Sequence, residues 1–313
     1  MRRCAILFAV VSLMLPLTAF AQTPTPEAAV NLFKNALKKS GNGDLDGAIE
    51  DYTRAITLSS RFDTRKNAGN SFSAGSNDEI TVVDPFTANA YTNRGLARYQ
   101  KGDYPGAIED FNKALRIRPG LAVAYLNRAA ALRATGDLEG ALKDLDRAIA
   151  LDKDFFRAYN NRGSVHLDLG HLDQALADLN HAVKLDDDVA ETFYQRGYTY
   201  LALKRFDEAV SDFNRVARLA PDMAWAYQGR GTALMQKGQM FEAMEDFSRA
   251  IERDPKLAWA YCNRGLVKVY LGQEGEAQKD FDECVKLKPE LKGDLETRIN
   301  LARHLRRIGK SEE

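Results

Sequence analysis

The sequence is poor in residues that bind transition metals, with three cysteines and four histidines among 313 residues. None of the histidines stands with another histidine or a cysteine at the spacing of a zinc site. The acidic run at 186–188 lacks the following glycine and the distal glutamate of a calcium loop, so we interpret it as an acidic turn. The sequence therefore predicts no metal and no cofactor.

Catalytic motifs are equally scarce. No glycine-rich loop has the pattern that cradles a phosphate, and no serine stands in a nucleophile elbow. Net charge of one sign is also missing, because 44 Lys and Arg residues balance 44 Asp and Glu residues. A neutral chain has no overall field that attracts nucleic acid or an anionic membrane. We therefore expect neither an enzyme nor a nucleic-acid-binding protein.

Long apolar runs are missing except at the start of the chain. Arg2 and Arg3 precede an apolar stretch over 5–17, and Ala19 and Ala21 form an A-x-A cleavage site. This pattern predicts a signal peptide over 1–21, cleaved after Ala21, and a periplasmic or secreted protein. The alternative is an uncleaved membrane anchor, which the shortness of the run and its interruption by Pro16 disfavour. We expect no transmembrane segment in the mature chain.

Only two cysteines follow the predicted cleavage site, Cys262 and Cys284. An oxidising compartment would permit a disulfide between them. Cys284, however, occupies a position that alanine fills in other parts of the sequence, which favours a small buried hydrophobic residue. Both interpretations remain open from the sequence.

A repeat of 34 residues organises the rest of the chain. An aromatic residue, a polar residue, an arginine and a small residue recur in six copies. They begin at Tyr91, Tyr125, Tyr159, Phe193, Tyr227 and Tyr261. A second block built around an alanine follows each copy, at Ala107, Ala141, Ala175, Ala209, Ala243 and Ala277. Each repeat thus carries two amphipathic helical patterns joined by a turn, most often at glycine.

This pattern resembles the tetratricopeptide-repeat family, whose signature is a 34-residue helix–turn–helix unit. The resemblance implies an all-α, right-handed superhelical solenoid that ends in a C-terminal capping helix. The predicted regular repeats span 88–121, 122–155, 156–189, 190–223, 224–257 and 258–291. We expect a linker and a degenerate first repeat over 22–60, a flexible insertion over 61–87 in which 80–83 packs back on the array, and a capping helix and tail over 292–313.

Two charged columns run through the repeats. The aspartates are Asp51, Asp110, Asp144, Asp178, Asp212, Asp246 and Asp280, and the arginines are Arg94, Arg128, Arg162, Arg196, Arg230, Arg264 and Arg298. The first repeat lacks its arginine, and the capping helix lacks an aspartate. We therefore predict a ladder in which each aspartate pairs with the arginine of the following repeat, from Asp51 with Arg94 to Asp280 with Arg298. The alternative is a set of solvated charges.

The resemblance also places the first helix of each repeat along a concave peptide-binding groove. The residues that precede the arginines are the carboxamides Asn93, Asn127, Asn161, Gln195 and Asn263, with Gly229 interrupting the series. Such a ladder suits the backbone of an extended peptide, although the carboxamides could instead bond neighbouring helices. Aromatic residues predicted to line the groove are Tyr99, Tyr194, Tyr198, Trp225 and Trp259.

The resulting hypothesis is a non-catalytic interaction scaffold of the cell envelope that binds an extended peptide or a partner helix. A subfamily that clamps the C-terminal carboxylate of chaperones carries paired basic and amide residues, whereas this chain has Thr92 with Leu96 and Leu126 with Ala130. Chaperone-tail binding is therefore disfavoured. The alternative hypothesis is a structural subunit that associates with itself as a homo-oligomer.

Overall fold

The computed structural model describes residues 27–67 and 85–309. The residues fall into two compact units, one ending at Leu169 and the other beginning at Gly170. The first unit contains α1 (Glu27–Gly41), α2 (Leu45–Asn67), α3 (Pro85–Gln100), α4 (Tyr104–Ile117), α5 (Ala122–Thr135), α6 (Leu138–Leu151) and α7 (Phe156–Asp168). The second contains α8 (Leu172–Leu185), α9 (Ala190–Ala202), α10 (Phe206–Leu219), α11 (Ala224–Gln236), α12 (Met240–Arg253), α13 (Ala258–Leu271), α14 (Glu274–Leu287), the 3₁₀ turn η2 (Pro289–Leu291) and α15 (Lys292–Gly309).

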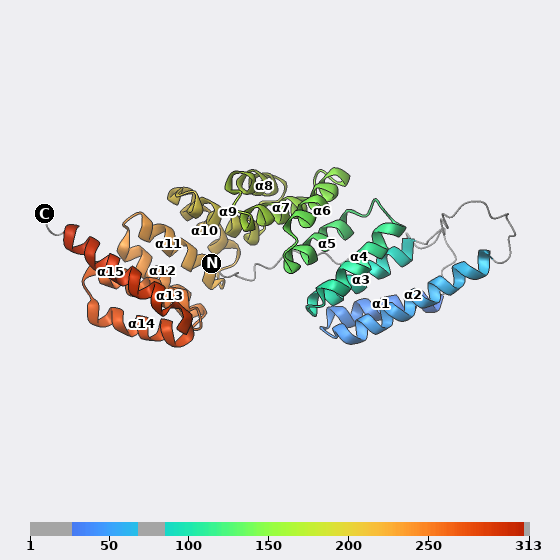
Figure 1. Cartoon of the computed structure of the whole chain (residues 1–313), viewed down its shortest axis with the longest axis horizontal. Coiled ribbons are helices and arrows are strands. Elements are labelled where there is room, and N and C mark those ends of the chain that lie inside the picture. Colours follow the sequence, from blue (N-terminus) through green and yellow to red (C-terminus); the bar gives the residue numbers. More distant parts are fainter. Residues whose placement is uncertain (1–26, 68–84, 310–313) are drawn as a thin grey trace. The chain divides into compact units, whose positions relative to one another are not determined.

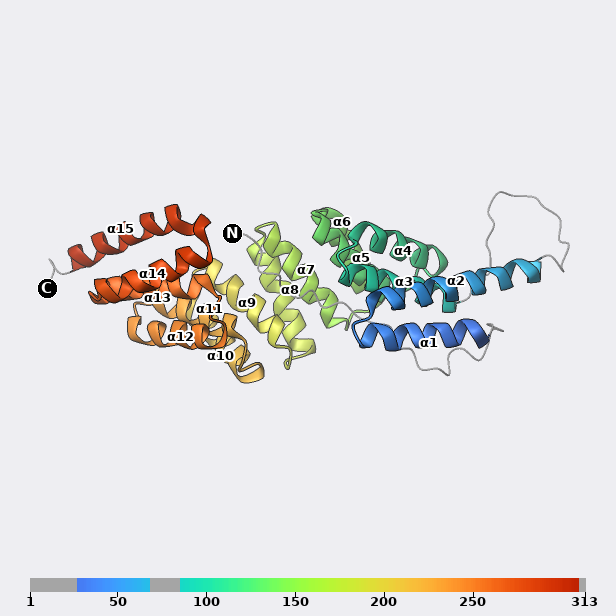
Figure 2. The ribbon, with the colours of Figure 1, turned by 90° about the horizontal axis from the view of Figure 1, so that it is seen from below.

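Consecutive helices pair as hairpins, and within each unit every second helix packs on the first helix of the next repeat (Figures 1 and 2). The predicted all-α array of helix–turn–helix repeats with a C-terminal helix is confirmed. The right-handed superhelical course of the array stays a prediction.

The turn inside each repeat is left-handed at one position. Glycine has φ between 76° and 90° there in six repeats, at Gly43, Gly102, Gly136, Gly170, Gly238 and Gly272. Only glycine adopts this conformation without strain from a Cβ atom. The fifth repeat places Lys204 at this position, with φ 57°.

The insertion occupies less of the chain than the sequence predicts. Helix α2 continues to Asn67 and α3 already begins at Pro85, so both ends of the predicted 61–87 segment are helical. Thr87 is buried in α3 and shares a hydrogen bond of 2.8 Å with Ser59 of α2. The predicted signal peptide over 1–21 and the apolar stretch over 80–83 lie outside the described residues.

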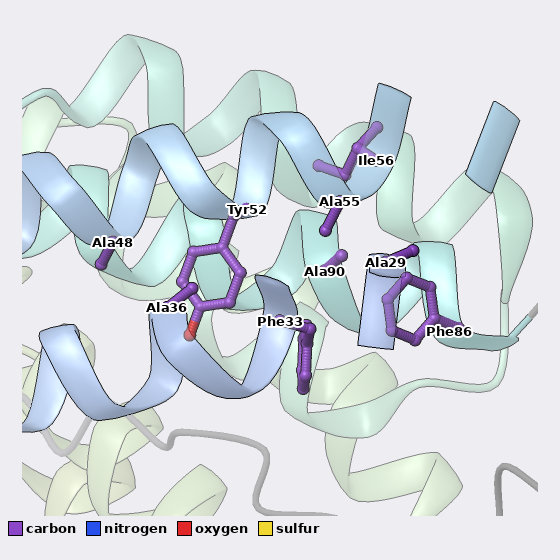
Figure 3. Packing of buried hydrophobic residues seen from close by; sticks show 9 residues of the cluster. All are labelled: Ala29, Phe33, Ala36, Ala48, Tyr52, Ala55, Ile56, Phe86 and Ala90. Atoms are coloured by element: carbon purple, nitrogen blue, oxygen red, sulfur yellow. The ribbon is translucent and has the colours of Figure 1, made fainter. Parts of the chain in front are cut away.

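The degenerate first repeat has a core of its own, in which three aromatic rings meet between alanines (Figure 3). The ring of Phe33 on α1 lies 5.5 Å from that of Tyr52 on α2 and 5.3 Å from that of Phe86 on α3. Phe86 belongs to the next repeat, so the core joins the two repeats. Burying these rings is the main favourable contribution here, because aromatic side chains remove the largest apolar area from water.

In the regular repeats a small residue on the first helix faces a large one on the second. A Cβ atom added to Gly95 of α3 would lie 2.8 Å from Cε1 of Phe111, which is fully buried on α4. The two backbones therefore approach closely only because Gly95 has no side chain. Where the large residue is the smaller Leu145, the small position holds Ala129.

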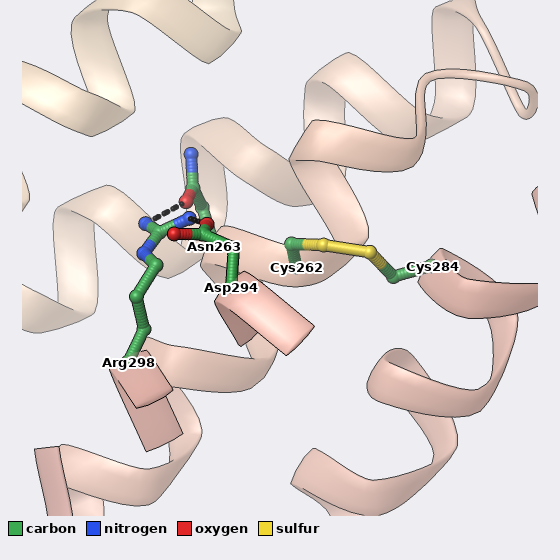
Figure 4. The surroundings of a disulfide bond; sticks show 5 residues. All are labelled: Cys262, Asn263, Cys284, Asp294 and Arg298. Carbon is green, nitrogen blue, oxygen red and sulfur yellow. Dashed lines mark hydrogen bonds and ion pairs between the residues drawn. A yellow bond between two sulfur atoms is a disulfide. The ribbon is translucent and has the colours of Figure 1, made fainter. Parts of the chain in front are cut away.

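In the last repeat a disulfide joins Cys262 of α13 to Cys284 of α14, with Cα atoms 5.4 Å apart (Figure 4). Both cysteines are fully buried, as expected for small core residues, but they are also bonded to each other. The disulfide lies in the cluster that holds Leu295 and Ala302 of α15. It therefore fastens together the two helices on which the C-terminal helix rests.

Candidate protein-binding surface

The arginine column lies on the first helices, and each arginine with a described partner aspartate bonds it bidentately. In α3, Nε and Nη2 of Arg94 donate to the two carboxylate oxygens of Asp110 on α4, over 2.9 and 2.6 Å. The same pair of bonds forms in four further repeats: Arg128 with Asp144, Arg196 with Asp212, Arg230 with Asp246, and Arg264 with Asp280.

The predicted pairing between neighbouring repeats is therefore wrong. Each of these arginines bonds the aspartate 16 residues later in its own repeat. At the start of the array Asp51 does not need Arg94, because Nζ of Lys39 lies 2.7 Å from its carboxylate. Lys39 stands one helical turn after the arginine position and so reaches the same carboxylate. At the other end Arg298 bonds Asn263 instead of Asp280.

The arginines nevertheless connect neighbouring repeats through their remaining donor. Nη1 of Arg128 donates over 2.6 Å to Asn112, which belongs to the second helix of the preceding repeat. Equivalent bonds run from Arg94 to Thr53, from Arg162 to Asp146, from Arg196 to Asn180, from Arg230 to Asn214 and from Arg264 to Ser248. A guanidinium has enough donors for both partners, so one side chain fixes three helices.

Burial and the aromatic column shape the electrostatics of these sites. Burial alone would lower the pKa of Arg94, but the hydrogen bond and the charge of Asp110 outweigh it and raise that pKa. The guanidinium also lies 5.3 Å from the ring centre of Tyr91, three residues earlier on the same helix. These arginines are thus structural residues whose donors are already used.

The carboxamide column is buried instead of lining an open surface. Asn93, Asn127, Asn161, Gln195 and Asn263 all have exposures of 4% or less. Gln195 donates to Glu191 over 3.2 Å, and neither amide atom of Asn161 has a hydrogen-bond partner within the described part of the chain. Side chains in this position do not present a continuous ladder to an extended peptide. Their role in binding a ligand stays a prediction.

Aromatic residues of the predicted groove are more accessible. In the second unit Tyr198 is half-buried, lies against Tyr194 with ring centres 4.8 Å apart, and donates from its hydroxyl to Oε1 of Gln228 over 2.7 Å. Trp225 and Trp259 are also half-buried. In the first unit Tyr99 is half-buried beside Tyr104, and burial raises its pKa.

The C-terminal helix occupies the groove side of α13. Helix α15 packs on α13 and leaves α14 largely uncovered. Its Leu295 and Ala302 are buried in the cluster that contains Cys262 and Leu266. These two α13 residues share the helix side that carries Trp259 and Asn263, because the four positions follow a spacing of three and four residues. We call this side, formed by Trp259, Cys262, Asn263, Leu266 and Val269, the inner side of α13.

Arg298 of α15 makes the polar contacts with this side. Its Nη2 donates to Oδ1 of Asn263 over 2.8 Å, and its guanidinium lies 5.9 Å from the ring centre of Trp259 (Figure 4). The nearest carboxylate oxygen belongs to Asp294, 3.9 Å away. Burial lowers the pKa of Arg298. Two of the predicted groove residues thus contact a helix in the structure, although that helix belongs to the same chain.

Because α15 lies over α13, it leaves a groove of about 750 Å³ beside α14. The floor is apolar, with Phe281 and Val285 from α14 and Leu295 and Ile299 from α15. The rim carries charges of both signs. In the internal repeats the next first helix packs against the corresponding face of the second helix.

Sequence reasoning missed Lys39 and the polar residues that receive the third arginine bond. A periodic Asn or Ser two residues after the aspartate was the available signal, at Asn112, Asn180, Asn214 and Ser248. It also missed that α15 leaves the stack, for which the signal is Ile299, a large residue at the small position of a first helix. A large residue there excludes the close approach that Gly95 permits.

Within residues 27–67 and 85–309 no three His, Cys, Asp or Glu side chains come together in a way that would hold a metal ion. None of the helices in these ranges combines the length and the apolar composition needed to cross a membrane.

Comparison with known families gives a consistent result. Two models described as Tetratricopeptide repeat match residues 88–121 and 190–223, and 156–189 and 260–291. A third, described as TPR repeat, matches residues 130–170 and 231–272. Together these matches cover more than half of the chain.

Individual relatives resemble parts of the chain. The heat-shock protein cognate (HSC) co-chaperone sgt12 of Aspergillus fumigatus is 33% identical over 109 residues, which is 30% of this chain and 30% of that protein. The structure of YrrB, described as a TPR protein with an unusual peptide-binding site, is 26% identical, covers 64% of this chain and 99% of its own, and gives a TM-score of 0.52. A tetratricopeptide repeat protein from Parabacteroides merdae is 20% identical, covers 88% and 99%, and gives 0.60.

Proposed function

This chain belongs to the tetratricopeptide repeat family, and from that premise we propose that it is a non-catalytic scaffold that binds a helix of a protein partner on the inner side of its first helices. A protein-interaction role follows from the family. The finer proposal concerns the location of the surface and the form of the ligand.

One observation carries the proposal. Helix α15 already lies on the inner side of α13, where Leu295 and Ala302 enter the apolar cluster and Arg298 bonds Asn263 beside Trp259. A helix therefore fits this side with both apolar and polar contacts. A partner helix can use the same kinds of contact on α9 and α11, where Tyr198 and Trp225 are half-buried.

A helical ligand suits this surface better than an extended peptide. Recognition of an extended backbone needs donors and acceptors at regular intervals, and here the carboxamides are buried. Aromatic and apolar side chains recognise the apolar face of an amphipathic helix instead. The peptide-binding site named for YrrB supports a peptide-binding role in general.

Self-association by end-to-end stacking is disfavoured at the first helix. Internal first helices place alanine, threonine or valine where they meet the preceding repeat, as at Ala90 and Ala97 of α3, which are fully buried. Helix α1 carries Asn31 and Lys38 at these positions, and both are exposed. A polar outer face is what a terminal repeat requires in order not to stack on another copy.

We also propose a location in the cell envelope. The apolar run followed by an A-x-A site supports export, and the disulfide between Cys262 and Cys284 supports an oxidising compartment.

Affinity capture with residues 22–313 from an envelope extract of the source organism tests the proposal. The wild-type chain and a Phe241→Ala control, altered at an exposed residue of α12, should retain the same partner. The double variant Tyr198→Ala/Trp225→Ala should bind it about tenfold more weakly, because aromatic contacts contribute most of the free energy of such interfaces. Equal capture by all three proteins would contradict binding on the inner side.

A further inference from the structure

The described chain exposes five large apolar residues, and three of them lie on α15. Leu301 is 55% exposed, Leu305 46% and Ile308 42%. Their spacing of four and three residues places them on one side of the helix. That side differs from the one that carries Leu295 and Ala302, which are buried against α13. Helix α15 is thus apolar on two sides, of which one has no covering element in the described chain.

The charge beside this exposed stripe is positive. From residue 298 to residue 309 the helix has four arginines, His304 and no acidic residue. Arg303 and Arg306 pair with Glu274 of α14, at 2.8 and 3.6 Å. Arg307 bonds only a backbone carbonyl, that of Arg303, among the described residues. The surface around Leu301, Leu305 and Ile308 therefore has an excess of positive charge in a chain of zero net charge.

Arg298 adds a specific position for a negative charge. It precedes Leu301 by three residues and Leu305 by seven, so it lies on the same side of α15 as the stripe. Every other arginine of the column has a hydrogen bond to a carboxylate within 3.0 Å, whereas the closest carboxylate to Arg298 is 3.9 Å away. A half-buried guanidinium gains most from a carboxylate partner, because the surrounding dielectric is low.

We propose that the exposed side of α15, formed by Arg298, Leu301, Leu305 and Ile308, docks an acidic amphipathic helix of a protein partner, with a side-chain carboxylate on Arg298 and apolar residues on the stripe. This proposal deepens the proposed function by naming the chemistry of the partner. The apolar stripe accounts for the apolar face of the ligand, and the arginines account for its negative charge.

An anionic membrane would also suit a basic amphipathic helix, but the surroundings of α15 favour a protein. Arg298 is recessed against Trp259 and Asn263, where a side chain reaches it more readily than a flat bilayer. Glu274 stands between Arg303 and Arg306 and would face the anionic headgroups.

The test uses residues 22–313 and a fluorescent helical peptide of 18 residues, designed with leucines on one face and glutamates beside them. Fluorescence anisotropy should show binding that weakens about tenfold in Leu301→Ser/Leu305→Ser and in Arg298→Gln, because each variant removes one half of the proposed recognition. The control Phe241→Ser, which removes an exposed apolar residue on α12, should bind as the wild type does. Circular dichroism checks that every variant keeps its helices.

Three results would overturn the proposal. The first is equal binding of a peptide in which glutamine replaces every glutamate, and the second is equal loss in Phe241→Ser. The third is stripe-dependent binding to phosphatidylglycerol vesicles without binding of the peptide. If the α15 variants keep the captured partner while Tyr198→Ala/Trp225→Ala loses it, the proposed function stands and this further inference fails.

Discussion

Arg196 donates from Nε and Nη2 to the two carboxylate oxygens of Asp212, over 2.8 and 2.7 Å, and both residues belong to the fifth repeat. The side chain of Asp212 is almost fully buried, and that of Arg196 is 16% exposed. Each charge therefore depends on the other for the hydrogen bonds it loses on leaving water.

The first prediction concerns this pair. Arg196→Ala and Asp212→Ala should each lower the free energy of unfolding by about 3 kcal/mol, because the remaining charge stays buried without its partner. The double variant should lose clearly less than the sum of the two single losses, by about 1–3 kcal/mol. Urea unfolding followed by circular dichroism measures all four proteins.

The matched control for this cycle is a pair without bidentate bonds, Arg196 with Asp246 of the next repeat. Arg196 bonds Asp212 and not Asp246, which is bonded by Arg230. The effects of Arg196→Ala and Asp246→Ala should therefore add. Additive losses for Arg196 with Asp212 would contradict the pairing within the repeat.

A second prediction follows from the close contact between Gly95 and Phe111. Gly95→Ala should destabilise the chain by about 1–3 kcal/mol, because the new Cβ meets the buried ring. Adding Phe111→Leu should restore part of the loss, since the third repeat already combines Ala129 with Leu145. Urea midpoints of the single and double variants provide the measurement, and a double variant weaker than both singles would refute the steric explanation.

The third prediction concerns Lys204, whose φ is 57° at a turn position that is glycine in the other repeats. Lys204→Gly should raise the free energy of unfolding by about 1 kcal/mol, because glycine removes the steric cost of the left-handed conformation. Lys204→Ala keeps a Cβ atom and should give no such gain. Thermal unfolding of the three proteins distinguishes backbone strain from an effect of the lysine charge.

The fourth prediction concerns the disulfide. Replacing Cys284 by alanine, which fills this position in most other repeats, should cost about 3 kcal/mol by removing a crosslink that closes a loop of 22 residues. A reductant should lower the stability of residues 22–313 by a similar amount and leave the Cys284→Ala variant unchanged. Two free thiols in the oxidised protein, counted by a thiol reagent before reduction, would contradict the disulfide.

The 34-residue period determined much of this protein by itself. Recurring residues such as Gly102 and Gly136 set the turns, and the spacing of apolar residues set two helices in each repeat. These features are local, because a left-handed turn and an amphipathic helix depend on nearby residues. The family, the all-α array and the C-terminal helix could therefore be predicted without the structure.

The tertiary structure alone decided how the elements contact one another. Counting seven aspartates and seven arginines suggested pairs between repeats, but the rotation of the two helices in a hairpin brings Arg94 to Asp110 instead. Periodicity cannot distinguish these pairings, since both keep the same spacing along the chain. It also cannot place α15, whose position on α13 depends on the apolar residues of two helices that meet only after folding.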